Sequence, residues 1–205
     1  MPQSMEKERE RVVLVRLSVE DWLARPPSVA AVRPCQCVAC GAASRPIGGK
    51  VVVQGHGYRR RTCLGPASPG GDCEARQLDL RRYRCVHCGA VMVAVPRGLL
   101  PRRRYLAAVI GLAIGLWGLR GLATPEVRER VARGSKPGTG KRWRTLERWV
   151  VDAAAGAFAR VTVTAGHDRR STAGRVATCL LGFVPPGMRH MDGEAQLYLG
   201  GAHAA

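Results

Sequence analysis

Two pairs of cysteines carry the clearest chemistry in this chain of 205 residues. Cys37 and Cys40 are separated by two residues, as are Cys85 and Cys88, and a glycine follows each pair. Two thiolates presented by one tight turn can reach a single tetrahedral ion at about 2.3 Å. The glycine allows the positive φ that wraps backbone amides around the sulfurs. The spacing therefore predicts one structural Zn²⁺ per chain, held by all four of these sulfurs.

Zinc binding would offset the entropy lost when the two cysteine pairs are brought together. Closing the 44-residue loop between the pairs costs about 3.4 kcal/mol of chain entropy, less than the roughly 10–16 kcal/mol that zinc contributes in finger peptides. A redox pair and four unrelated thiols are the competing interpretations of the two pairs.

The cysteines outside the two pairs also leave alternatives open. Cys63 and Cys73 could form a second site with His56 or Cys35, or remain free thiols.

The charge distribution favours a polyanionic partner. Lys and Arg number 33 against 15 Asp and Glu, a formal net charge of +18. Residues 35–104 contribute +10 and residues 105–160 contribute +6, whereas each end contributes +1. Because a uniform coding bias would not spare the two ends, we expect the middle of the chain to face double-stranded DNA.

Runs of arginine supply the expected phosphate contacts. Adjacent strand residues face opposite sides, so a triple arginine keeps charge on both faces. Tyr58, Tyr83 and Tyr105 lie beside these runs and could add stacking or phosphate contacts. The predicted contacts in these runs are Arg59, Arg60, Arg61, Arg81, Arg82, Arg84, Arg102, Arg103 and Arg104.

Hydrophobic patterns predict an α+β chain: a small zinc-ribbon β domain, then a three-helix, helix-turn-helix-like bundle. Strands are expected at residues 11–17, 50–54, 58–63, 76–84 and 90–95, with Gly55-His56-Gly57 as a turn. Ser18 is the expected N-cap of a short helix. The predicted segments are 1–34 (strand, short helix and linker), 35–100 (ribbon), 101–160 (helices) and 161–205 (tail of no assigned role).

The helical segment should contain the sequence reader. Helices are expected at about 102–118, 124–132 and from Thr145, where Leu146, Trp149, Val150 and Ala153 form one apolar face. Basic residues at or near the start of the third helix would meet phosphate and base edges. These residues are Lys141, Arg142, Arg144 and Arg148.

Together these motifs resemble a known bacterial family. The series CVACG, VVVQGHGYRRR, LDLRRYRCVHCGA and VPRGLLPRRRY is similar to the N-terminal zinc-ribbon region of insertion-sequence transposases, and RWRTLERW is similar to the helix-turn-helix that follows it. The resemblance spans roughly residues 35–155. It implies a transposon-associated, zinc-dependent DNA-binding protein whose partners are DNA and a transposase or a second copy of the chain.

The resemblance does not extend to catalysis. Such transposases continue into an RNase H-like domain with three metal-binding carboxylates, whereas only 45 residues and the acids Asp168, Asp192 and Glu194 follow Arg160 here. The connection before the third helix is also longer than in a compact helix-turn-helix. We therefore expect a DNA-binding region that is not an enzyme.

Two other functions remain open. The apolar stretch from Tyr105 to Leu119 could tether a zinc-ribbon protein to a membrane, although 15 helical residues cover about 22 Å of a roughly 30 Å hydrocarbon core. The ribbon could instead dock another protein. Because the charged N-terminus does not resemble an export signal, we expect a cytoplasmic, nucleoid-associated protein and no membrane partner.

Overall fold

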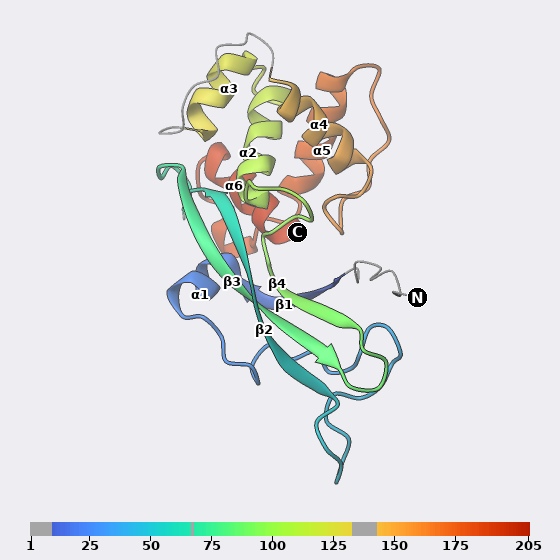
Figure 1. The fold of residues 1–205 in the computed structure, drawn as a ribbon. Helices are drawn as coiled ribbons and strands as arrows, with labels where there is room; N and C mark the ends of the chain where they lie inside the picture. Colours follow the sequence, from blue (N-terminus) through green and yellow to red (C-terminus); the bar gives the residue numbers. More distant parts are fainter. Residues whose placement is uncertain (1–9, 67, 133–142) are drawn as a thin grey trace, which may run out of the picture. The chain divides into compact units, whose positions relative to one another are not determined.

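The computed structural model describes residues 10–66, 68–132 and 143–205, and within them it is α+β, as predicted. These residues form a four-stranded sheet and six α-helices, which are labelled in Figure 1. The elements are β1 (Arg11–Ser18), α1 (Val19–Ala24), β2 (Val53–Gly65), β3 (Glu74–Cys85), β4 (Val91–Arg97), α2 (Ala107–Gly118), α3 (Thr124–Val131), α4 (Arg144–Ala154), α5 (Arg169–Leu181) and α6 (Gly193–Ala204).

The chain divides into two compact units. The first, here called the sheet unit, comprises described residues 10–61 and 77–97. The second, the helical unit, comprises the described parts of 62–76 and 98–205. The last residues of β2 and the first residues of β3 thus group with the helices.

The sheet unit has strand order β1-β4-β3-β2. β1 runs parallel to β4, with Val12 opposite Val93, and β3 runs antiparallel to β4, with Tyr83 opposite Met92. An uninterrupted apolar run makes β4 a buried interior strand, which is the usual consequence of burial on both faces. The predicted Ser18 cap is confirmed, since Ser18 Oγ accepts a hydrogen bond from the amide of Asp21 at 3.0 Å.

The expected turn at Gly55-His56-Gly57 is wrong, because β2 continues through it from Val53 to Gly65. Gly57 adopts a φ of +77° within the strand, a conformation that costs glycine little. A Cβ on Gly55 would lie 3.0 Å from Val29 Cγ1, so this glycine serves close packing. Both glycines therefore have roles inside a strand, where they can mark a local distortion or close approach.

The helical unit is built around α2, in which every residue from Ala107 to Leu116 is buried. α2 packs against α5 and α6. A Cβ on Gly111 would lie only 2.8 Å from Gly201 Cα, so glycine on both helices lets α2 and α6 approach closely. α2 has 12 residues, and no described helix has the length and apolarity needed to cross a bilayer.

α2 begins at Ala107 rather than at Arg102 as expected. Residues ahead of it extend alongside the end of β2: the Leu64 amide donates to the Arg104 carbonyl at 2.7 Å, and the Leu106 amide donates to the Leu64 carbonyl at 2.9 Å. Arg102 has a φ of +56°, outside the right-handed helical region. Pairing with β2 thus removes these residues from the helix.

Residues 161–205, for which the sequence indicated no role, contain α5 and α6. An aspartate caps the N-terminus of each helix: Asp168 Oδ1 accepts from the Ser171 amide, and Asp192 Oδ1 accepts from the amides of Glu194 and Ala195. Such caps satisfy amides that have no partner within a helix. This segment completes the core around α2.

Candidate metal centre

The two C-x2-C pairs form turns of the same design, here called the first knuckle (residues 37–42) and the second knuckle (residues 85–90). In the first, the Gly41 amide donates to the Cys37 carbonyl at 2.8 Å; in the second, the Gly89 amide donates to the Cys85 carbonyl at 2.9 Å. Gly41 and Gly89 have φ values of +73° and +77°. The predicted role of these two glycines in the turns is confirmed.

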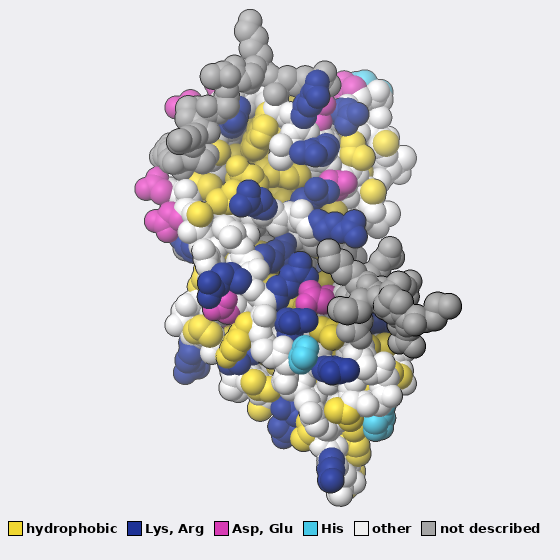
Figure 2. Space-filling view, in the orientation of Figure 1, with side chains coloured by type: hydrophobic (Ala, Val, Ile, Leu, Met, Phe, Trp, Pro, Cys, Tyr) yellow, Lys and Arg dark blue, Asp and Glu magenta, His cyan; other side chains and the backbone are white. Residues whose placement is uncertain are grey.

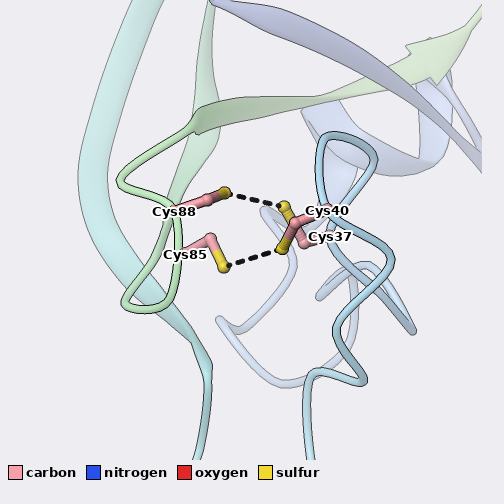
Figure 3. Close-up of side chains that lie close together, drawn as sticks. All are labelled: Cys37, Cys40, Cys85 and Cys88. Carbon is pink, nitrogen blue, oxygen red and sulfur yellow. Dashed lines mark hydrogen bonds between the residues drawn. The ribbon is translucent and has the colours of Figure 1, made fainter.

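The knuckles bring all four sulfurs together (Figure 3). Cys37 Sγ lies 3.7 Å from Cys88 Sγ, Cys40 Sγ lies 3.8 Å from Cys85 Sγ, and all four lie within 4.8 Å of one another. Sulfurs around a tetrahedral zinc at 2.3 Å are separated by about 3.8 Å. The four cysteines could therefore hold a metal ion, and their donor type and spacing fit a tetrahedral thiolate site.

The knuckles are braced through Ser44 and Val52. The Val52 amide donates to the Ser44 carbonyl at 2.9 Å, and the Val86 amide of the second knuckle donates to the Val52 carbonyl at 3.0 Å. Ser44 is buried, and its hydroxyl donates to the Pro34 carbonyl. Sequence reasoning missed this brace, because a serine and a valine in a loop carry no motif.

Thiol ionisation in the cluster is strongly uneven. Burial raises the pKa of Cys37, but hydrogen bonds from the amides of Cys40 and Ala39 and from neighbouring thiols outweigh it and bring this pKa to about 7. The Ala90 amide lowers the pKa of Cys88, but desolvation and the other three thiols outweigh it and raise this pKa to about 12. Four adjacent thiolates repel one another, so a cation is needed to hold all four ionised.

Half of the donor set faces solvent. Cys37 and Cys85 are buried, whereas Cys40 and Cys88 are exposed. No further group of three or more potential ligands gathers in residues 10–66, 68–132 and 143–205. The second site suggested for Cys63 and Cys73 is therefore not seen there.

The arginines predicted on β2 and β3 are placed in the sheet unit, and several meet acids. Glu10 pairs with both Arg59 and Arg82, and Asp79 pairs with Arg60 at 3.1 Å. Arg81 donates to the Pro27 carbonyl and lies over the Tyr58 ring. Arg61 is half-buried, whereas Arg84 is exposed and has no charged partner among the described residues.

The helical unit holds the other predicted contacts that the structure describes. Arg103 pairs with Asp152, while Arg102, Arg104, Arg144 and Arg148 are exposed. Lys141 and Arg142 lie outside the described residues. Figure 2 shows Lys and Arg side chains spread over the visible face of each unit, with fewer acidic side chains among them.

Comparison with known proteins finds no family model, no curated protein and no solved structure that matches this chain.

Proposed function

We propose that this chain is a zinc-dependent protein that binds double-stranded DNA through a zinc ribbon formed by the two knuckles and their adjoining strands. The proposal rests on the four-sulfur cluster. Cys85 and Cys88 lie at and just after the end of β3, and Cys37 and Cys40 lie in the loop before β2. The adjoining strands are rich in arginine. Zinc has the structural role here: it holds two otherwise separate turns in one arrangement.

Charge in the sheet unit supports a polyanionic partner. Its described residues include 13 Lys and Arg against four Asp and Glu. The ion pairs of Arg59 and Arg60 are at the surface, where such pairs contribute little to stability. The guanidinium groups of Arg59 and Arg60 can therefore leave their carboxylate partners and bind a DNA phosphate instead. Arg84, which has no charged partner among the described residues, can bind a phosphate without breaking an ion pair.

In the same proposal, α3 and α4 form the helix-turn-helix-like reader that the transposase resemblance implies. The apolar face predicted for α4 is buried: Leu146, Trp149, Val150 and Ala153. Arg144 and Arg148 lie on the exposed side, where a helix can present arginine to guanine in the major groove.

The acids that follow Arg160 support a role without nuclease chemistry. Asp168 and Asp192 accept hydrogen bonds from helix-capping amides, and Glu194 pairs with Arg130. Each carboxylate thus has a structural partner. We propose a DNA-binding region that is not an enzyme.

One observation favours a second function, the docking of another protein. β1 lies at the edge of the described sheet, and its outward residues Val12 and Leu14 are exposed. An exposed apolar edge strand can pair with a strand of another chain. In that case binding to DNA would be weak and would change little with salt.

Titration of the zinc-loaded protein onto duplex DNA at several salt concentrations tests the proposal. If six arginines contact phosphates, log K should fall against log salt with a slope of roughly −5. The variant Arg59→Gln/Arg60→Gln/Arg84→Gln should have a slope shallower by two to three, roughly 0.9 for each phosphate that is no longer neutralised. A flat response of the unaltered protein would contradict DNA binding.

A further inference from the structure

The loop between the first knuckle and β2 presents an apolar side chain in an unusual position. All six residues from 45 to 50 are exposed, and Ile47 at the centre is completely exposed. Figure 1 shows this loop projecting beyond the end of the sheet, before β2 begins. Turns usually place polar residues or glycine at such corners, so an exposed isoleucine there calls for an explanation.

Local bonding holds the tip in one conformation. The Gly49 amide donates to the Pro46 carbonyl at 3.1 Å, and Gly48 has a φ of +69°, as a type II turn with Ile47 at its first corner requires. At the base, Ser44 is bonded to Pro34 and to Val52, and Val52 in turn bonds the second knuckle. The tip is therefore an ordered projection whose base is bonded to the metal centre.

The chemistry of the tip suits insertion into DNA. Arg45 and Lys50 flank Ile47, so a cation stands on each side of the apolar side chain. Proteins that bend DNA insert such an apolar wedge between base steps while basic neighbours contact the adjacent phosphates. A membrane is the less suitable partner, since one isoleucine contributes only about 1.5–3 kcal/mol of burial.

The tip also lies within reach of the predicted phosphate contacts. Ile47 and Arg59 are twelve residue steps apart, so they are separated by at most about 40 Å at strand rise. That length corresponds to about twelve base-pair steps of duplex DNA. One duplex could therefore meet the wedge and the β2 arginines within little more than one helical turn.

We infer that Ile47 is a DNA-bending wedge: it inserts between stacked base pairs and kinks the duplex, with Arg45 and Lys50 on the flanking phosphates. This inference rests on the proposed DNA-binding function and adds a separate property to it, namely deformation of the DNA. Bending requires no base-specific contact, so it is expected on duplexes of unrelated sequence.

Ligase-mediated circularisation tests the wedge. A duplex of about 100 base pairs is shorter than the persistence length of about 150 and circularises slowly unless a protein bends it. The zinc-loaded full chain should accelerate circularisation at least several-fold. Ile47→Ala should abolish the acceleration while weakening DNA binding less than about tenfold, because the cost of unstacking offsets much of the burial gained.

Two matched variants complete the experiment. Ile47→Leu keeps an apolar wedge and should still accelerate circularisation, and Val38→Ala removes an exposed apolar side chain from the first knuckle and should leave it unchanged. Circularisation by Ile47→Ala at the unaltered rate would overturn the inference. So would loss of binding to phosphatidylserine-containing vesicles in Ile47→Ala with DNA bending intact. If the unaltered chain shows no salt-dependent DNA binding, the proposed function itself has failed.

Discussion

The helical unit buries α2 from Ala107 to Leu116, whereas the two side chains between the cysteines of each knuckle in the sheet unit are exposed. Val38 is 45% exposed and Val86 is 54% exposed, so little apolar surface holds one knuckle against the other. Hydrophobic burial therefore stabilises the helices, and the knuckles depend on their sulfurs and a few backbone hydrogen bonds. Loss of the metal should therefore disorder the knuckles and leave the helical unit folded.

Removal of a metal ligand should disorder the knuckles and leave the helical unit folded, which is the largest effect that we expect. Cys85→Ser leaves three sulfurs, and structural zinc contributes on the order of 10 kcal/mol to such folds, so residues 36–44 and 85–91 should lose their order. Hydrogen exchange followed by mass spectrometry should show lost protection there and unchanged protection in α2 and α6.

Cys35→Ser is the matched control for that experiment. Cys35 is an exposed cysteine two residues from Cys37 and outside the four-sulfur cluster. Its replacement should change neither the zinc content nor the hydrogen-exchange protection of the two knuckles. Equal loss of protection in both units of Cys85→Ser would show that the units do not differ in their dependence on metal.

A substitution in the core of the helical unit should destabilise the helices and leave zinc binding intact, with a smaller effect than the loss of a ligand. Gly111→Ala places a Cβ 2.8 Å from Gly201 Cα, so α2 and α6 must separate, at a cost of about 1–3 kcal/mol. Thermal unfolding should show a less stable protein that still binds zinc. Gly187→Ala, where a Cβ meets nothing within 4 Å, should unfold like the unaltered chain.

Single arginine substitutions should affect DNA binding differently in the sheet unit and in the helical unit. Arg84→Gln in the sheet unit and Arg148→Gln in the helical unit each remove an exposed guanidinium. If Arg84 contacts phosphate only, its loss should lower the salt slope by about 0.9 for every DNA sequence. Arg148→Gln should instead weaken binding to preferred sequences by about 1–3 kcal/mol. Identical effects on all sequences would remove α4 as the reader.

The helix cap at Asp168 gives the smallest expected effect. The hydrogen bond from the Ser171 amide holds the pKa of Asp168 below its usual value, with His167 and Arg170 acting in the same direction. A lowered folded-state pKa means that the carboxylate stabilises α5 above its ordinary unfolded pKa, and this contribution is lost as pH falls through the folded pKa. Asp168→Ala should lower the unfolding temperature slightly at pH 7, and the difference from the unaltered chain should shrink in strong acid.

The predictable parts of the molecule were those that depend on neighbouring residues. Each C-x2-C-Gly turn brings two sulfurs together locally, and the buried face of α4 follows from its period, so both could be deduced from the sequence. The meeting of the two knuckles was indicated by the donor set alone.

Features that depend on distant residues could not be deduced in the same way. The parallel pairing of β1 with β4 joins segments about 80 residues apart, and the extension beside Leu64 displaces the start of α2. α6 is apolar on most sides and shows no amphipathic period. Asp168 and Asp192 were the available signals for α5 and α6, since aspartate is a preferred N-cap.

X-ray absorption at the zinc edge of the purified full chain would determine whether the four sulfurs bind zinc. We expect one zinc per chain with four sulfur neighbours at about 2.3 Å, and a loss of that four-sulfur shell in Cys85→Ser. Purified protein without bound zinc, or zinc surrounded mainly by nitrogen and oxygen, would contradict it.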